Sequence, residues 1–588
     1  MFTSPTQKLP TQKRWQVIPS APPDVLHRFR DMSPTLAHVL HNRGMTDPVA
    51  AARFLHADDH AVGSMLGFRG KRASIDKALA RIRQAIKAGE TIAIYGDFDA
   101  DGVTSTALLM QTLRYLGASA IPYIPHRVDE GYGLNSDALL RLARQGVKLV
   151  ITVDCGIRSI VEVEDGKAAG LDIIITDHHS LGDSLPDAYA VINPKRSDVP
   201  YTEDMLAGVG VAFRLAEALL TIAGGRPARS DMPVLTPDEL LDLVAIGTVA
   251  DLAPLNRLEN RALVKRGLAM LNQTRRPGLR ALHEVSNLRS GSIDAQSIGY
   301  AIGPRINAAG RLDSAMLAYE LLVTRDDNRA ADLALQLHNL NLQRQELTRQ
   351  AQDLIRGQLD DPGAVPLIFA GDSSFKPGIV GLVAGRLCEE FFRPAVVLEL
   401  GEHESRASCR SIPGFDITRA LDACAALLVR HGGHAQAAGF TVTNDNIPAL
   451  RERLNELARE ALESQDLAPS IAIDLTLDAG SISIELAAEL EKLEPTGHSN
   501  PPPVFVTRNL KVIEQRLVGK EERHIKLKLG RGAGLAPIDA IGFHLAPTYP
   551  AGAERVDVVY HLEINEWNGQ RTPQLNVMDV RATGAEGM

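Results

Sequence analysis

The amino-acid sequence predicts an α/β protein in which a mainly parallel sheet is followed by a long helix, a second and smaller α/β unit, and a C-terminal β-barrel. Three observations lead to this prediction. Strand-like apolar runs alternate with helical segments from residue 76 to about residue 255. Residues 326–356 contain neither glycine nor proline, which is typical of one long helix. Residues 503–582 hold five stretches of alternating apolar and polar residues, the pattern of half-buried antiparallel strands.

The first two regions of the chain differ in their expected secondary structure. Residues 1–75 should form a small helical segment, because apolar residues recur there at helical spacing. The next region alternates strands with helices, which indicates a parallel sheet with helices on both faces. The carboxyl ends of such strands share one edge of the sheet. The predicted strands lie near 91–95, 120–124, 148–153 and 172–176, and the predicted helices cover 103–116, 136–145 and 158–169.

The later elements follow in order. A helix is expected over residues 238–249, just before Asp251. The long stretch from residue 326 carries a narrow apolar stripe between polar flanks, which is common in a helix that bridges two domains. The run VPLIFAG opens the second α/β unit, and the five final strands favour a barrel of the oligonucleotide-binding (OB) type. The domain boundaries predicted from these patterns are 1–75, 76–325, 326–360, 361–468 and 469–588.

Composition limits the cellular setting. At 588 residues the chain should divide into about three or four domains, because single cores stop growing well below that length. Four cysteines without CxxC spacing indicate a reducing compartment. The N-terminus lacks a signal-like apolar segment, and charged residues interrupt the most apolar stretch. We therefore expect a soluble, cytoplasmic protein without membrane contact.

The net charge of −9, taken alone, argues against a nucleic-acid partner, because phosphate binding usually leaves a basic footprint. A multidomain enzyme, however, can confine its positive charge to one channel. Carboxylates that bind metal also count as negative in this sum, although the bound ions offset them. The net charge therefore does not exclude nucleic acid.

Two turns carry the clearest chemical signal. The acidic turn from Asp97 to Gly102 holds three aspartates, and Asp177-His178-His179 follows a second strand-like run. Neighbouring carboxylates repel one another unless cations neutralise them, and imidazole nitrogens suit transition metals. Packing does not require such a cluster. The two turns together predict a divalent-metal site.

Each turn also has a purely structural explanation. The acidic turn could begin an EF-hand calcium loop, but Leu108 occupies the twelfth position, where that loop needs a bidentate glutamate. A cap on a helix that starts at Val103 would explain one carboxylate and not three. The Asp-His-His triplet alone fits a surface loop with a helix cap.

Two further aspartates favour the metal site over these explanations. Asp154 follows the strand predicted at 148–153, and Asp251 follows the helix predicted at 238–249. Five carboxylates with one or two imidazoles can hold two divalent ions, one carboxylate acting as a bridge, and two ions about 4 Å apart suit phosphoester hydrolysis. The mixed oxygen and nitrogen donors favour Mn²⁺ or Mg²⁺ over calcium. The candidate residues are Asp97, Asp99, Asp101, Asp154, His178, His179 and Asp251.

An ordered series of motifs makes the chain resemble the DHH phosphoesterase family, and within it the single-strand-specific bacterial exonucleases. The series extends over nearly the whole chain and is far more specific than any one motif. The motifs are YGDFDADG at 95–102, VDCG at 153–156, TDHH at 176–179, GTVAD at 247–251, GPRINAAGR at 303–311, KPGIVGLVAGRL at 376–387 and GGHAQAAGF at 432–440.

The resemblance implies roles for the acidic residues. It makes Asp99, Asp101, Asp154, His178 and Asp251 metal ligands and places His179 near the scissile phosphate. The chain departs from many small DHH phosphatases at Tyr95, because they have a histidine at this position. Asp97 is the candidate to supply the missing ligand.

The second α/β unit resembles the DHH-associated domain and offers groups that can bind phosphate. Gly432-Gly433-His434 can expose backbone N–H groups to phosphate oxygens, although a tight turn before a strand explains a Gly-Gly pair equally well. Ser408 and Arg410 offer a hydroxyl and a bidentate guanidinium. By resemblance, Arg127 and Arg305 join this set.

The function implied by the resemblance is hydrolysis of single-stranded DNA from the 5′ end to mononucleotides in DNA repair and recombination. Expected partners are single-stranded DNA, a single-strand-binding protein and a helicase, and a monomer is the default. Basic residues of the terminal barrel would contact the downstream strand, although each also fits a solvated strand face. These barrel residues are Lys520, Arg523, Lys526, Lys528 and Arg531.

Two alternative functions remain open at this point. One is a DHH phosphodiesterase of short oligonucleotides or cyclic dinucleotides, which would lack the helical N-terminal segment and the terminal barrel. The other is a non-catalytic DHH-type scaffold that binds DNA, which would have lost metal ligands. The sequence retains the barrel pattern and the acidic residues.

Overall fold

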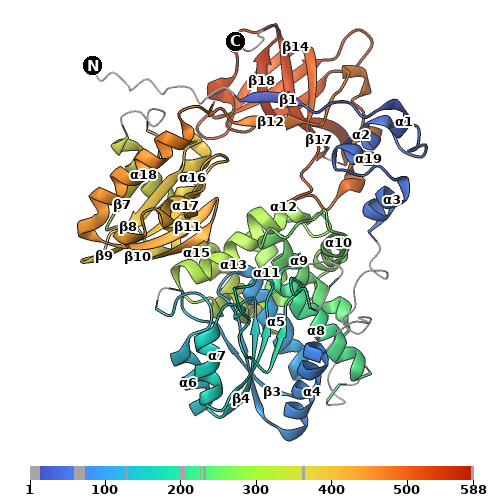
Figure 1. Ribbon diagram of the computed structural model, residues 1–588. Helices are drawn as coiled ribbons and strands as arrows, with labels where there is room; N and C mark the ends of the chain where they lie inside the picture. Colours follow the sequence, from blue (N-terminus) through green and yellow to red (C-terminus); the bar gives the residue numbers. More distant parts are fainter. Residues whose placement is uncertain are drawn as a thin grey trace.

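The computed structural model describes residues 13–57, 73–127, 129–198, 201, 205–224, 227–228, 234–359, 365–465, 467–567 and 569–584. Three larger sheets each have their own hydrophobic core, and the long helix α15 lies between the first two of them (Figure 1). The α/β class, the bridging helix and the C-terminal barrel predicted from the sequence are confirmed.

The first sheet is parallel throughout, in the order β3-β2-β4-β5-β6. Alternate residues of β2 face opposite sides: Ile92 and Ile94 join the core beneath α4, α5 and α8, whereas Ala93 and Tyr95 pack toward α6 and α7. The elements are α4 (Ala73–Ala88), β2 (Thr91–Tyr95), α5 (Ala100–Tyr115), β3 (Ser119–Tyr123), α6 (Ser136–Arg144), β4 (Val147–Val153), α7 (Ile160–Ala168), β5 (Asp172–Thr176), β6 (Ala190–Ile192) and α8 (Gly208–Ile222).

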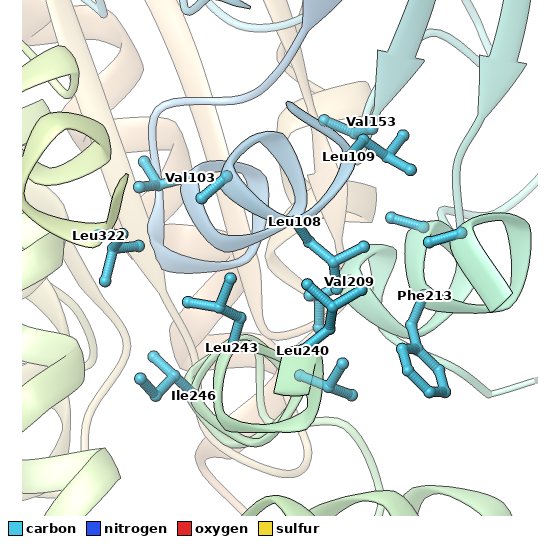
Figure 2. Packing of buried hydrophobic residues seen from close by; sticks show 14 of the residues in the cluster. Val103, Leu108, Leu109, Val153, Val209, Phe213, Leu240, Leu243, Ile246 and Leu322 are labelled. Carbon is cyan, nitrogen blue, oxygen red and sulfur yellow. The ribbon is translucent and has the colours of Figure 1, made fainter. Parts of the chain in front are cut away.

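A helical layer completes this first domain. Figure 2 shows Val103 and Leu108 of α5 packed with Val209 of α8 and with Leu243 and Ile246 of the helix α9; all five side chains are fully buried. This contact fixes the N-terminus of α5 beside the C-terminus of α9. The layer comprises η2 (Pro237–Leu240), α9 (Leu241–Ala250), α10 (Leu258–Asn272), α11 (Pro277–Val285), α12 (Ala295–Ser297), η3 (Ile298–Ile302), α13 (Gly303–Leu312) and α14 (Met316–Val323).

Helix α15 (Asp327–Gln358) connects the two α/β units. It begins at Asp326, whose side chain accepts a hydrogen bond from the backbone N–H of Arg329. Leu333 and Leu337, near its start, belong to the first core, whereas Ala351 and Ile355, near its end, belong to the second. The narrow apolar stripe of α15 therefore contributes side chains to the first core near its start and to the second core near its end.

The second α/β unit has a mixed sheet in the order β10-β11-β9-β8-β7. Its strands β8 and β7 are parallel, and the other neighbours are antiparallel. The elements are β7 (Ile368–Asp372), α16 (Pro377–Phe391), β8 (Ala395–Glu399), β9 (Glu404–Arg410), α17 (Ile417–Asp422), η4 (Ala425–Leu427), β10 (Leu428–His434), β11 (Ala437–Thr443), η5 (Asn444–Asn446) and α18 (Ile447–Leu462).

The C-terminal domain is a closed five-stranded barrel, because its first strand, β14, pairs with both β15 and β17. The sequence predicts these five strands, but it predicts them as antiparallel, whereas β16 and β18 pair in parallel. The elements from here to the C-terminus are β12 (Ser470–Ile473), β13 (Leu475–Thr476), η6 (Ala479–Ser481), α19 (Ile484–Leu490), η7 (Glu491–Leu493), β14 (Phe505–Val518), β15 (His524–Gly530), β16 (Ile538–Gly542), η8 (Ala546–Thr548), β17 (Arg555–Trp567) and β18 (Gln570–Ala582).

The N-terminal segment packs onto this barrel. Leu36, Leu40 and Phe54 lie in the same core as Phe505 and Tyr560. The sequence predicts only helices here, but a short strand precedes them and pairs in parallel with β12. Its partner lies near the other end of the chain, so a local pattern could not reveal the pairing. The N-terminal elements are β1 (Arg14–Val17), α1 (Pro23–Leu26), α2 (Pro34–Asn42) and α3 (Pro48–His56).

Arg261 of α10 ties the first domain to both chain ends. Its side chain is fully buried, its guanidinium carbon lies 4.0 Å from the centre of the Phe54 ring, and it donates hydrogen bonds to five backbone carbonyls. One carbonyl belongs to Phe54, and the others belong to the segment from Lys492 to Pro495. Such a network keeps a buried charge satisfied. Among the helices of the described ranges, none combines the length and apolar character needed to cross a bilayer.

Candidate active site

The acidic residues gather where three neighbouring strands end. Asp97 and Asp99 follow β2, Asp154 directly follows β4, and Asp177 directly follows β5, and these strands are adjacent in the order β2-β4-β5. The topology therefore places the carboxylates on one edge of the sheet, as predicted. Asp154 adopts a left-handed backbone conformation, with φ +62°. This conformation is uncommon outside glycine, asparagine and aspartate.

Three overlapping groups of side chains could hold metal ions. They are Asp97, Asp99 and Asp154; Asp154, His178 and His179; and Asp101, His178 and Asp251, with the ligand atoms of each group within 4.8 Å of one another. The His178 Nε2 atom lies 3.0 Å from Asp154 Oδ1, 3.7 Å from Asp251 Oδ2 and 3.8 Å from Asp101 Oδ2. Asp154 and His178 each belong to two groups, so the geometry suits two ions that share a bridging carboxylate.

Two of the carboxylates also stabilise helices. The Asp99 side chain caps α5 by accepting hydrogen bonds from the backbone N–H groups of Asp101 and Gly102. Asp101 accepts 2.7 Å hydrogen bonds from the N–H groups of Gly208 and Val209 at the start of α8. The capping explanation is therefore correct for Asp99, but it accounts for only part of the cluster.

Three further ligand atoms of the cluster lack hydrogen-bond partners among the described residues. Asp97 Oδ1, Asp154 Oδ1 and His178 Nε2 are all buried without a well-oriented hydrogen bond. Such atoms are rare in proteins, because an unsatisfied buried polar group destabilises the fold. A Cβ atom on Gly208 would lie 2.8 Å from Asp154 Oδ1, so this glycine allows the close approach of α8. These atoms fit divalent cations as their missing partners.

The pKa values point in the same direction. Burial, followed by repulsion from neighbouring aspartates, raises the pKa of Asp251 to about 9 and that of Asp101 to about 7. The same causes raise the pKa of Asp97 and of Asp154. Burial also lowers the pKa of His178 to about 3, which leaves a neutral imidazole able to bind metal. Without cations, ionising all of these carboxylates would place like charges together, which is why their pKa values rise.

His179 differs from its neighbour. Burial acts to lower its pKa, but the hydrogen bond with Asp177 and the nearby carboxylates outweigh burial and raise the pKa. The Asp177 carboxylate lies 2.8 Å from His179 Nδ1 and accepts hydrogen bonds from the backbone N–H groups of Ile157, His178 and His179. Asp177 therefore orients the two histidines. The hydroxyl of Tyr132 lies 3.2 Å from His179 Nε2 and 3.3 Å from Nδ1.

A second site lies where the two α/β units meet. Arg127, Arg311, Ser408 and Arg410 line a cavity of about 260 Å³ together with the start of α16. Burial lowers the pKa of Arg127 and of Arg311. Arg406 and Glu399 also line the cavity, so four guanidinium groups and a hydroxyl share it with one carboxylate. This excess of positive charge suits a phosphate group.

The structure places the other predicted phosphate-binding residues at different positions. Arg305 lies away from the lining of this cavity: its guanidinium donates to the backbone carbonyl of Ala301 and lies 3.2 Å from His338 Nδ1. Gly432 and His434 are exposed on β10, in register through β11 with Ser408 and Arg410 of β9, and so share their face of the sheet. A Cβ atom on Gly433 would lie 2.4 Å from the backbone of Ala438, so that glycine serves strand packing.

The basic residues of the barrel also differ in their surroundings. On β15, Lys526 lies opposite Arg516, whereas Lys528 lies between Glu514 and Asp539. Arg523 forms a 2.7 Å ion pair with Glu521, and Arg531 donates to the carbonyls of Ala536 and Ile482. Lys520 is exposed in the turn before β15.

Sequence reasoning missed several residues at these sites. These residues are Arg311, Asn307 and Tyr132, and only Tyr132 lies outside the motifs that the sequence analysis identified. Asn307 accepts a hydrogen bond from the backbone N–H of Ala100 and so braces the acidic turn. Both Asn307 and Arg311 belong to the motif GPRINAAGR, so this motif was the sequence pattern that could have pointed to them.

Three family models match the chain in the order of its domains. The DHH family N-terminal domain matches residues 91–248, the DHHA1 domain matches residues 364–460, and the RecJ OB domain matches residues 473–579. The fold and the acidic cluster are thus those of a DHH-family phosphoesterase.

Similar proteins narrow this class. The chain is 38% identical over 556 residues to the single-stranded-DNA-specific exonuclease RecJ of Bacillus subtilis, covering 93% of this chain and 68% of that protein. It is 37% identical to RecJ of Salmonella typhimurium, in a match that covers 94% of this chain and 96% of that protein. The crystal structure of RecJ in complex with Mn²⁺ from Thermus thermophilus superposes with a TM-score of 0.81 at 31% identity, covering 97% of this chain and 80% of that one. The chain belongs to the RecJ family.

Solved structures of this family also contain the expected metals. A second Thermus thermophilus structure, RecJ in complex with Mg²⁺, matches with a TM-score of 0.76 at 30% identity, covering 97% of this chain and 79% of that chain. The prediction of Mn²⁺ or Mg²⁺ as cofactor is confirmed at the level of the family.

Proposed function

We propose that this protein is a metal-dependent exonuclease that degrades single-stranded DNA from its 5′ end and releases 5′-mononucleotides. One observation carries the proposal: the metal cluster and the arginine-lined cavity border the same turn. Phe98 lies between Asp97 and Asp99, and the Arg127 guanidinium carbon lies 4.4 Å from the centre of its ring. A strand end bound in the cavity would therefore present its first phosphodiester to the cluster.

The metal ligands would be Asp97, Asp99, Asp101, Asp154, His178 and Asp251. When bound, two divalent cations activate a water nucleophile and stabilise charge on the phosphate oxygens. Asp154 would bridge them, because its carboxylate is common to two of the three groups. Asp97 would take the place of the histidine that many small DHH phosphatases have where this chain has Tyr95.

His179 would act on the scissile phosphate. Asp177 holds its Nδ1 side and so orients the ring. A protonated imidazole can donate a hydrogen bond to a phosphate oxygen whose charge grows during hydrolysis. In this role His179 stabilises the transition state and does not bind metal.

Polarity follows from the second site. The terminal 5′-phosphate would be bound by Arg127, Ser408 and Arg410, together with Arg311, which lines the same cavity. Gly432 and His434 lie on the adjoining face of the sheet and would contact the same end of the strand. Binding a terminal phosphate at a fixed place sets the cleaved bond relative to the strand end. Arg305 is proposed to contact the DNA backbone outside the cavity.

The barrel and the cellular setting complete the proposal. Lys520, Arg523, Lys526, Lys528 and Arg531 are candidate contacts for the downstream strand, with Lys526 the best placed because Arg516 lies beside it. We infer a monomer, as the default state, that works in the cytoplasm. The resemblance to exonucleases of DNA repair implies that it acts beside a single-strand-binding protein and a helicase.

A digest of one oligonucleotide labelled at either end tests the proposal. With Mn²⁺ present, the 5′ label should appear at once as a mononucleotide, whereas the 3′ label should remain on progressively shorter strands. Chelation of the metal should stop both reactions, and a blunt duplex should resist. Early release of the 3′ label, or internal fragments from both substrates, would contradict the assigned polarity.

A further inference from the structure

The segment between β3 and α6 links the arginine-lined cavity to the metal cluster. Arg127, near its start, lines the cavity and stacks on Phe98. Tyr132, further along, places its hydroxyl 3.2 Å from His179 Nε2, and its ring lies 6.3 Å from that of Phe98 in an edge-on arrangement. One short piece of backbone therefore carries a residue at each of the two sites.

Glu130 anchors the middle of this segment. One of its carboxylate oxygens accepts a 2.5 Å hydrogen bond from the Tyr123 hydroxyl at the end of β3, and the other accepts a 2.8 Å hydrogen bond from the His126 backbone N–H. Arg141 of α6 pairs with the same carboxylate. The anchor thus ties the segment to both elements that it connects.

Tyr95 anchors the far end. Its ring is fully buried under the sheet edge, and its hydroxyl donates a 3.2 Å hydrogen bond to the backbone carbonyl of Gly133. Gly131 and Gly133, on either side of Tyr132, have φ values of +81° and +87°, which other residues rarely adopt. Glycine backbone is freer than any other, so a Gly-Tyr-Gly stretch needs outside contacts to hold one conformation.

We propose that Tyr95 and Glu130 are positioning residues that fix the span between the cavity and His179. A nucleotide unit has a limited length, so a fixed distance between the cavity and His179 selects the phosphodiester one nucleotide from the bound 5′-phosphate. The product is then a mononucleotide, and cleavage depends on that phosphate. Neither residue touches the substrate or the ligand atoms. This inference rests on the proposed function, and it gives Tyr95 a task where smaller DHH enzymes have a histidine.

The test compares Tyr95→Phe and Glu130→Gln with the unmodified protein on two single strands that differ only in a 5′-phosphate or a 5′-hydroxyl. The ratio of kcat/KM on the two strands should fall by about five-fold in Tyr95→Phe, the effect of one buried hydrogen bond, while kcat/KM on the hydroxyl strand changes by less than about two-fold. Dinucleotides should appear among the products of both variants.

Tyr560→Phe provides a matched control. Tyr560 is also fully buried and its hydroxyl lies 2.8 Å from Thr507 Oγ1, but it lies in the barrel core. It should lose similar thermal stability and keep the wild-type ratio and mononucleotide products. If Tyr95→Phe does not fold, Glu130→Gln decides the matter, because Glu130 lies nearer the surface.

Two results would overturn the inference. The first is a wild-type phosphate preference with mononucleotides alone in the variants, and the second is an equal loss of activity on both strands, which marks a merely structural role. Failure of the unmodified protein to release mononucleotides would instead refute the proposed function, so the two failures are distinguishable.

Discussion

Gly381 on α16 provides the sharpest test of the phosphate cavity. A Cβ atom at this position would lie 3.0 Å from Ser408 Oγ and 3.6 Å from Arg410 Nη2, inside the space between them. Gly381→Ala should therefore make the protein more stable and less active. The first effect comes from the helix and the second from the cavity, so one substitution separates folding from binding.

The magnitudes follow from these contacts. Alanine in a helix interior is favoured over glycine by about 0.5–1 kcal/mol, so the free energy of unfolding should rise by up to that amount. A hydrogen bond to a charged group contributes about 1.5–3 kcal/mol. Loss of one such bond to the terminal phosphate should lower kcat/KM on a 5′-phosphorylated strand by about 10- to 150-fold. Activity on a 5′-hydroxyl strand should change little.

Gly385→Ala is the control, because it lies one turn further along α16 and its Cβ atom would meet only the aliphatic part of Arg410 at 3.9 Å. It should gain the same stability and keep full activity. Steady-state kinetics on both strands and urea unfolding provide the measurements. If Gly381→Ala retained wild-type activity on the phosphorylated strand, this cavity would not be the phosphate site.

Three other predictions concern the cluster, the domain junction and the barrel. Asp154→Asn replaces the carboxylate with a residue that also tolerates the left-handed backbone. It should lower the rate of Mn²⁺-dependent hydrolysis by at least about 100-fold, whereas affinity for single-stranded DNA, measured by fluorescence anisotropy, should stay within about two-fold of the unmodified protein. Near-normal turnover would show that Asp154 does not bridge the metal ions. Arg261→Met should lower the free energy of unfolding by about 3 kcal/mol or more, because five backbone carbonyls lose their donor, three of them in buried hydrogen bonds. A loss under about 1 kcal/mol in urea titrations would contradict that account. Lys526→Ala should reduce the magnitude of the slope of log affinity against log salt concentration by about 0.7, the effect of one lost phosphate contact. Lys528→Ala should leave this slope unchanged, because Lys528 lies between two acidic residues. Equal slopes for the two variants would show that neighbouring charge does not decide which lysine binds DNA.

The sequence predicts the first sheet well because its signals are local. The strand that ends at Tyr95 and the one that ends at Val153 match the apolar runs to within one residue. Parallel topology then places Asp97 and Asp154 together, which is why the metal cluster could be assembled from motifs alone.

The parts that depend on distant contacts were harder to predict. Neither the pairing of β1 with β12 nor the buried network around Arg261 has a local signature, since the partners lie more than 200 residues apart in the sequence. Tyr132 is a similar case: only the folded loop shows that its hydroxyl meets His179. Arg305 shows the opposite error: its motif predicts a place in the phosphate cavity, but in the structure its side chain lies outside the cavity lining and donates to the backbone carbonyl of Ala301.

The shared core of the N-terminal helices and the barrel has a consequence for biosynthesis. Leu36, Leu40 and Phe54 are synthesised more than 400 residues before their core partners Phe505 and Tyr560. At synthesis rates of about 5–20 residues per second, the early helices wait on the order of 20–90 s for their partners. Throughout that interval the early helices lack the barrel residues that cover their apolar faces in the folded protein.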